Sequence, residues 1–350
     1  MAVLDQLLTS VRKLDEISQR KISAIVGAAV ADAAARPLHW VYDNNALQSY
    51  IADVKDTPEF FPESKSPFYT LPTGETSCYF DIAESVLNGV AAFSNSRYSY
   101  NTICNELVKS FGPGNPNYDL EARQVYMEQR RRGEIDGPIV GKWFHGALIK
   151  FLENYRDGIG SKPYGDPHIK ETDGFCANLP LACKYVGSDT FDEMSLEIIQ
   201  SMSTWPTAVS HGMVASKIIA NIIRTGDAYN IMDIKQEIAD SYPDVVKSLE
   251  AVESVIKQDL HHTRAVNYVF GSPCYNPGSF QGAIHAVQTS GSFKEAVRKT
   301  IRAGGCNCSR SFFIGAITGA KYGINGIPVD WMRKTNNIER IIKTALKTYP

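Results

Sequence analysis

Two cysteines stand one residue apart in a polar stretch near the C-terminus, "CNCS" at residues 306–309. Two glycines precede it, and a run of small and apolar residues typical of a buried helix follows it. The unpaired backbone N–H groups at a helix start favour an anion or a thiolate. Three chemistries fit: a reactive thiolate, a redox pair, or an oxygen-ligand metal site that has lost its carboxylates. Cys306 and Cys308 are therefore the reactive-thiol candidates if the loop is exposed.

Other residue types narrow these choices. A tetrahedral zinc site takes four ligands, typically in two pairs, and no second Cys-x-Cys, Cys-x-x-Cys or His-x-x-x-His pair occurs. Small cysteines packed in the core are the competing interpretation. We expect the histidines to be ordinary core or surface residues, because His261 and His262 would point apart on a helix and the others stand alone. Those others are His39, His145, His168, His211 and His285.

Asp32 is a carboxylate inside the small-residue run "GAAVADAAA". Small faces of this kind let helices approach closely, and a second one, "IGAITGA", follows the cysteine loop. A carboxylate there needs hydrogen-bond partners or solvent. Asp32 either caps a neighbouring loop or faces a polar cleft, and the sequence leaves both open.

Helical periodicity predicts the elements that hold these residues. Ser292 and Gly226 supply cap signals at a helix start and a helix end. The best strand candidate is the short "YVFGS" at 268–272, and long loops are expected at 56–76, 112–119 and 162–174. We predict one all-α domain over residues 1–350, a compact multi-helix bundle whose long loops line a central cleft. The first periodic segment, 17–37, places on one face Ile17, Ile22, Ile25, Val26 and Ala29.

Composition excludes several partners. Of 350 residues, 43% are hydrophobic and 21% charged, and the net charge of −2 favours neither nucleic acid nor an anionic membrane surface. No apolar run reaches the ~18 residues that span a bilayer, and the amphipathic N-terminus carries early acids, unlike a signal peptide. Seven cysteines in a long chain predict reduced thiols and a cytoplasmic location.

Three segments together resemble one family. "GAAVADAAARPLH" (27–39), "TGET" (73–76) and "GGCNCS" (304–309) occur in the order of the motifs of the ADP-ribosylglycohydrolase superfamily. The resemblance implies an all-α fold that binds two divalent cations beside an ADP-ribose cleft. Asp32 matches the family helix, while His39 stands for its glutamate.

The metal-ligand positions implied by this resemblance are altered. The family motif T-D-D-T reads "TGET", so Gly74 and Glu75 replace its aspartates. Cys306 and Cys308 replace both aspartates of G-G-D-x-D-T. Since Mg²⁺ and Mn²⁺ prefer oxygen ligands, we expect neither metal and no other cofactor. Asp32, His39 and Glu75 remain as vestigial cleft candidates, and the degenerate ligand positions are Thr73, Gly74, Glu75, Cys306, Cys308 and Ser309.

Longer strings resemble one branch of this superfamily. "PLHWVYD" (37–43), "GSPCYNPGSFQGAIHAV" (271–287) and "NCSR" (307–310) are similar to selenoprotein J and the jellyfish J-type lens crystallins. This implies a structural lens crystallin, a pseudoenzyme that needs no partner. Two alternatives stay open: a divergent ADP-ribosyl hydrolase that uses Mg²⁺ or Mn²⁺, and a module that binds an ADP-ribose-like small molecule without turnover. Metal content and ADP-ribose titration distinguish the three.

Overall fold

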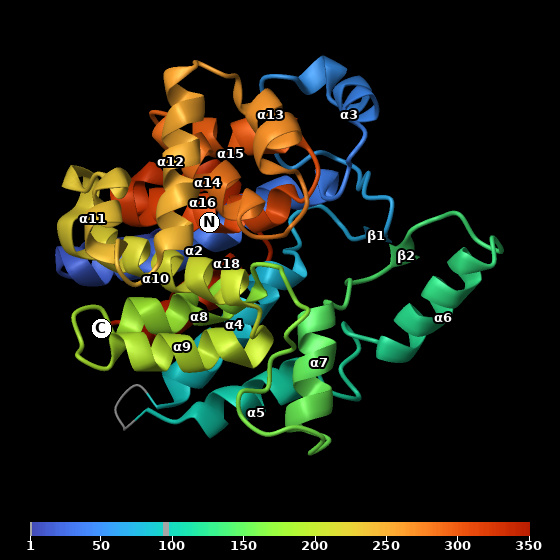
Figure 1. The fold of residues 1–350 in the computed structure, drawn as a ribbon, viewed down its shortest axis with the longest axis horizontal. Coiled ribbons are helices and arrows are strands. Elements are labelled where there is room, and N and C mark those ends of the chain that lie inside the picture. The colour runs from blue at the N-terminus through green and yellow to red at the C-terminus, as the bar shows by residue number, and fades with distance from the viewer. Residues whose placement is uncertain (1, 94–97) are drawn as a thin grey trace.

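Helices fill the computed structural model, which describes residues 2–93 and 98–350 (Figure 1). The prediction of an all-α fold is confirmed. Two short strands, β1 (Tyr69–Thr70) and β2 (Ile139–Val140), pair in parallel with Tyr69 opposite Ile139. The helices are α1 (Ala2–Arg12), α2 (Glu16–Ala35), α3 (Asn44–Tyr50), α4 (Cys78–Ala92), α5 (Tyr100–Phe111), α6 (Leu120–Arg131), α7 (Gly146–Tyr155), α8 (Asp173–Lys184), α9 (Phe191–Met202), α10 (Pro206–Thr225), α11 (Ile234–Ile238), α12 (Pro243–Lys257), α13 (His262–Ala265), α14 (Gly278–Gln288), α15 (Phe293–Ala303), α16 (Asn307–Tyr322), α17 (Val329–Lys334) and α18 (Ile338–Thr348).

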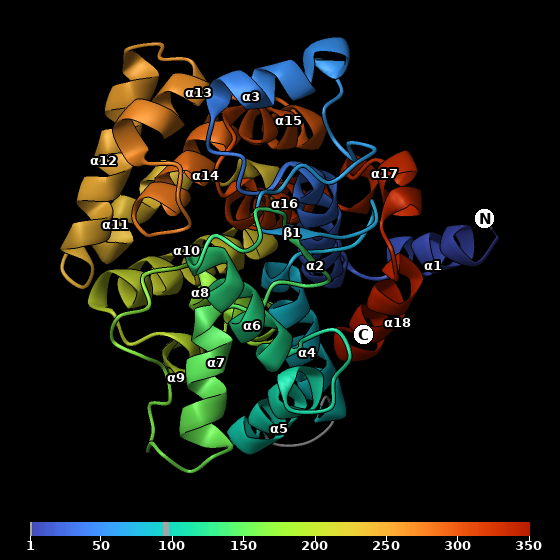
Figure 2. The same ribbon diagram turned by 90° about the vertical axis from the view of Figure 1, so that its right-hand side faces the viewer.

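Helices α2 and α16 form the centre, and the other helices surround them (Figure 2). The two small-residue runs of the sequence face each other here. A Cβ atom built on Gly315 would lie 2.2 Å from the carbonyl oxygen of Gly27, and one on Gly319 would lie 2.1 Å from that of Ser23. The backbones are therefore closer than any larger side chain allows.

Two hydrophobic clusters divide the core. The larger one surrounds α2 and α16, and the smaller one joins α4, α5, α7, α8 and α9. Helix α4 contributes to both, because its Leu87 belongs to the larger cluster while Ile82, Val86 and Val90 belong to the smaller. This double burial fixes the first turn of α4, which carries part of the candidate site.

The predicted caps are confirmed. The Ser292 hydroxyl accepts a hydrogen bond from the backbone N–H of Glu295, 3.2 Å away, at the start of α15. Gly226 ends α10 with a φ of 67°, a left-handed conformation that glycine adopts at low cost.

Two predictions were wrong. The segment proposed as a strand, "YVFGS", lies mostly in a π-helical turn (Val266–Phe270) that continues α13, and Gly271 ends it with a φ of 98°. Ile17 is 42% exposed, although the rest of its predicted face is buried. Helix α2 is enclosed on all sides beyond its first turns, so a single apolar face does not describe it. Among the described residues, no helix is long and apolar enough to cross a bilayer.

Candidate functional site at the start of helix α4

Asp32 joins the end of α2 to the start of α4. Its two carboxylate oxygens accept hydrogen bonds from the backbone N–H and the hydroxyl of Ser77, each 2.6 Å long. Ser77 is the N-cap residue of α4. The sequence left two interpretations open for Asp32, a cap on a neighbouring loop or a position facing a polar cleft. The structure supports the cap. Burial raises the pKa of its carboxyl to about 7, against the opposing effect of the two hydrogen bonds from Ser77.

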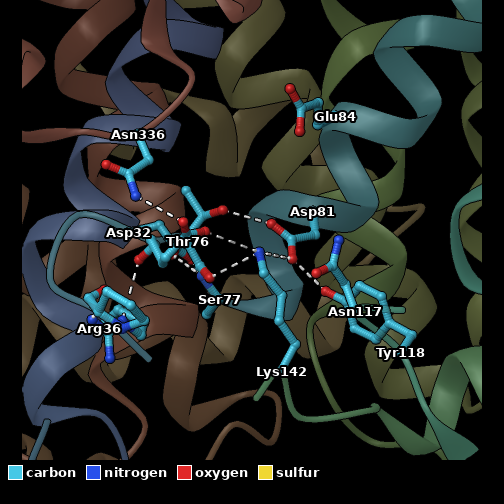
Figure 3. A network of polar contacts seen from close by, with 12 residues as sticks. Asp32, Arg36, Thr76, Ser77, Asp81, Glu84, Asn117, Tyr118, Lys142 and Asn336 are labelled. Carbon is cyan, nitrogen blue, oxygen red and sulfur yellow. Dashed lines mark hydrogen bonds and ion pairs between the residues drawn. The ribbon is translucent and has the colours of Figure 1, made fainter. Parts of the chain in front are cut away.

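A lysine lies at the centre of the polar network beside this cap (Figure 3). The Lys142 ammonium is 2.5 Å from the Asp81 carboxylate and 3.8 Å from that of Glu75, and it donates to the carbonyl oxygen of Thr76 at 3.4 Å. The hydroxyls of Thr76 and Tyr118 also donate to Asp81. Although burial opposes it, the attraction of Asp81 raises the pKa of Lys142, so the side chain is a cation at neutral pH.

The predicted ligand positions of "TGET" are occupied by other interactions. Thr73 donates its hydroxyl to the carbonyl oxygens of Phe61 and Pro62, at 2.9 and 3.0 Å. Glu75 accepts from the side-chain amide of Asn336 at 2.7 Å. Sequence reasoning did not find Lys142, because it follows β2 on an irregular segment without periodicity.

Gly74 has a backbone conformation that excludes the aspartate of the family motif. Its φ is 98°, and a Cβ atom there would lie 2.3 Å from the carbonyl oxygen of Lys334. An aspartate at this position would strain the backbone and displace the loop or the end of α17.

Cys306 and Cys308 lie at the start of α16, and both are buried. The Cys306 sulfur is 3.3 Å from both His39 Nε2 and the Tyr79 hydroxyl, and His39 Nδ1 is 2.8 Å from the Tyr69 hydroxyl. Burial opposes ionisation of Cys306, but hydrogen bonds from Cys274 and His39 lower the pKa of its thiol. The prediction of reactive thiols at Cys306 and Cys308 required an exposed loop. In the structure both cysteines are buried, so this condition is not met.

The neighbours of Cys306 on α16 have other roles. Burial raises the pKa of the Cys308 thiol, whose sulfur lies 4.0 Å from the carbonyl oxygen of Asp32. The Ser309 hydroxyl donates to the carbonyl oxygen of Cys306 at 2.9 Å and contacts the hydroxyl of Ser279. Gly304 and Gly305 form the predicted turn, with φ of 69° and 61°.

These side chains do not fit two divalent cations. Across residues 2–93 and 98–350, no group of three or more His, Cys, Asp or Glu side chains is arranged to hold a metal ion. Thiols are soft ligands, whereas Mg²⁺ and Mn²⁺ select hard oxygen atoms. The carboxylate of Asp81 already pairs with the Lys142 ammonium.

Several histidines that seemed to stand alone have partners. His145 Nδ1 is 2.6 Å from the Asp173 carboxylate, and His211 Nε2 is 2.9 Å from the Ser248 hydroxyl. His262 and His285 pair through their Nδ1 atoms at 3.0 Å, and the Nε2 atoms of these two histidines are buried without a hydrogen-bond partner. Sequence spacing could not reveal these pairs, because the partners lie on different helices.

An open groove of about 870 Å³ lies beside the network, between α5, α6 and α7. The predicted loop 112–119 lines it, as expected of a long loop at a cleft. Its wall carries four acidic side chains, those of Asp119, Glu121, Glu153 and Asp157, and the basic side chain of Arg156, which pairs with Asp157. The buried groups Asp32, His39 and Cys306 do not line this groove.

Comparison with known proteins shows which family the chain belongs to. A family model of ADP-ribosylglycohydrolases matches residues 14–349, and the chain belongs to this family. Crystallin J1A of Tripedalia cystophora is 29% identical over 331 residues, covering 95% of this chain and 96% of that protein. Crystallin J1B of the same organism is 26% identical over 333 residues, with the same coverage. A solved structure titled "ADP-ribosylglycohydrolase-related protein complex" shares the fold with a TM-score of 0.60 and 19% identity, covering 96% of this chain and 99% of that one.

The raised pKa of Asp32 can be tested by measuring the stability of the protein at different pH values. The pKa of the Asp32 carboxyl is about 7 in the folded protein, well above the 3.8 that is usual for an aspartate, so the folded state binds this proton more tightly than the unfolded state. Its contribution is therefore most favourable below pH 4 and is lost as the pH rises through 7. In Asp32→Asn this dependence is absent, so the stability of the variant relative to wild type should increase by about 4 kcal/mol from pH 4 to pH 8.

Urea unfolding followed by circular dichroism at several pH values measures this difference. Asp227→Asn is the matched control, because Asp227 is 71% exposed beside Lys321. A stability difference between Asp32→Asn and wild type that stays constant with pH would contradict the raised pKa.

Proposed function

We propose that this protein is a structural, crystallin-like member of its family in which the two-metal site has degenerated and hydrolysis has been lost. The observation that carries the proposal is the ammonium of Lys142, which neutralises Asp81 and approaches Glu75 at the start of α4. A fixed cation there repels a dication. The proposal includes one domain over residues 1–350 and a cytoplasmic location in lens cells.

The altered ligand positions support the loss of metal. Gly74 offers no side chain, and Cys306 and Cys308 offer buried sulfur in place of carboxylate oxygen. The resemblance to the family implies that two bound cations activate the attacking water. None of the side chains described at these positions carries a positive charge that could replace the cations. The groove beside the network is lined by four acidic side chains and one arginine, so its net negative charge disfavours a diphosphate. The printed names of two relatives, Crystallin J1A and Crystallin J1B, support the structural role.

Metal and nucleotide titrations test the loss of the site. Calorimetry with Mg²⁺, Mn²⁺ and ADP-ribose, separately and together, should give no saturable binding, because the acids are buried or already paired. A metal-dependent family hydrolase measured in parallel serves as the positive control. A two-site isotherm with Mn²⁺ would favour the hydrolase alternative, and saturable ADP-ribose binding without metal would favour the binding module.

The structural role has its own test. Quantitative mass spectrometry of dissected lens and of other tissues should find the protein concentrated in the lens, as refraction by concentration requires. An equal abundance in tissues without a lens would contradict the crystallin role while leaving the loss of the metal site intact.

A further inference from the structure

Helix α6 (Leu120–Arg131) projects from the body of the protein. It lies at the outer edge in Figure 1 and at the front of the perpendicular view in Figure 2. All 12 of its residues are described, and of these only Tyr126 is buried. A surface hollow beside it is lined by side chains of α6 alone, which shows that this face is open. Because helices of this length are only marginally stable by themselves in water, the open face is suited to pack against a partner.

The inner face of α6 rests on aromatic rings. Tyr126 packs edge-on against Trp143, with ring centroids 6.2 Å apart, and the Arg123 guanidinium lies 4.9 Å from the centre of the same indole. The Arg130 guanidinium lies 5.0 Å from the centre of the Phe68 ring. These contacts fix the orientation of the helix and direct Arg123 and Arg130 toward the body.

The start of α6 lies in an acidic surrounding. Asp119 and Glu121 are exposed there, and both line the groove between α5, α6 and α7. The opposite wall of this groove adds Glu153 and Asp157. Among the described residues that line the groove, Arg156 is the only basic one, and it pairs with Asp157. This end of α6 therefore carries a net negative charge.

The end of α6 is basic. Arg131 and Arg132 are 73% and 61% exposed, and both pair with the carboxylate of Glu128. Arg132 also lies 3.8 Å from the carboxylate of Glu134. Residues 128–134 hold three arginines and two glutamates, so this end keeps a net positive charge.

We propose that α6 is a docking surface for a second copy of this chain, in which the two α6 helices lie antiparallel across a two-fold axis. This arrangement places Arg131 and Arg132 of each copy against Glu121 of the other, beside the other's acidic groove, so the same contact forms twice. Val125, which is 50% exposed, lies between the charged ends and is covered by the pairing. A parallel pairing would instead bring like charges together. The surface is independent of the proposed crystallin role.

The expected association is weak and reversible. Two helices of this length bury less than the area of about 1,600 Å² that is standard for stable complexes. Acids in the first turn and bases in the last also stabilise a single helix through its own dipole. The stability of the monomer therefore does not test the pairing, whereas its association does.

Sedimentation equilibrium of the full-length chain from about 1 μM to about 1 mM measures this association. In wild type we expect monomer at the lowest concentrations and dimer at the highest. Added NaCl should shift the balance toward monomer, because salt screens exposed charges. A wild-type chain that stays monomeric over the whole range would overturn the proposal.

Two charge-reversed variants locate the surface. Glu121→Lys brings basic side chains together at both ends of the helix pair, and the double variant Arg131→Glu, Arg132→Glu brings acidic side chains together there. Each variant alone should dimerise at least about tenfold more weakly than wild type. An equimolar mixture of the two should recover the dimer, because opposite charges again meet at both ends. Recovery in the mixture also shows that both variants are folded.

The double variant Arg333→Glu, Lys334→Glu is the matched control. These two adjacent, exposed residues end α17, and Arg333 pairs with Asp5 of α1 rather than with any residue of α6. The control changes the net charge as much as the double variant of α6, and it should dimerise like wild type. A dimer that the α6 variants leave unchanged would overturn the proposal, as would a mixture that fails to associate.

Discussion

Replacing Gly315 by valine is expected to prevent the protein from folding. A Cβ atom at this position would lie 2.2 Å from the carbonyl oxygen of Gly27 and 2.6 Å from the Cβ of Ala31. Overpacking a core costs about 1–3 kcal/mol when side chains can move aside. Here the obstacle is the backbone of α2, which cannot rotate away, so we expect a loss of at least about 5 kcal/mol, comparable to the whole stability of many domains.

Circular dichroism against temperature measures this effect. Gly137→Ala is the control, because a Cβ atom on Gly137 meets no heavy atom within 4 Å and its φ is not positive. The control should melt close to wild type or slightly above it. A cooperative Gly315→Val transition within a few degrees of wild type would mean that α2 and α16 do not approach as closely as described.

Replacing Lys142 by methionine should cost about 3–5 kcal/mol, because it leaves the Asp81 carboxylate without its cation in a site that excludes most water. The side chains of Lys142 and Asp81 are only 13% and 11% exposed. Methionine preserves the length of the side chain, so packing changes little. The ammonium is charged in the folded state up to a pH above its ordinary range. The stabilisation is therefore full below the ordinary pKa of lysine, and it is lost as the pH rises through the raised value.

Urea unfolding at pH 7 checks the loss. Lys150→Met removes a comparable ion pair with Glu153 at 2.8 Å, but these side chains are 45% and 40% exposed. That control should change stability by about 0.5 kcal/mol or less. Equal effects of the two substitutions would show that the pair of Lys142 and Asp81 is screened by solvent, and the argument for a built-in cation would fail.

The sequence could predict the helices because their signals are local. Ser292 and Gly226 mark a helix start and a helix end through their own backbone preferences, and the small-residue runs predict the close packing of α2 and α16. The strand prediction at 268–272 failed because β-branched and aromatic residues also fit a short π-helical turn whose neighbours decide its conformation.

The site was less predictable because its parts are distant in sequence. Asp32 was identified as a buried carboxylate, but its partner Ser77 lies 45 positions away. Lys142 approaches Asp81 from an irregular segment 61 positions away, and no spacing rule connects them. Gly74 packs against the end of α17, which lies far away in the sequence. The motif alone therefore does not show whether glycine stands there because a metal ligand was lost or because the backbone requires it.

The position of α2 and α16 also has a consequence for synthesis on the ribosome. The side-chain amide of Asn307 at the start of α16 donates to the carbonyl oxygen of Ala35 at the end of α2, across 272 positions. At about 5–20 residues per second, translation needs roughly fifteen seconds to a minute to cover that interval. During this time the side of α2 that packs against α16 lacks that partner. Long-range contacts of this kind form slowly even after synthesis. We therefore expect this part of α2 to be a binding site for chaperones until α16 has left the exit tunnel.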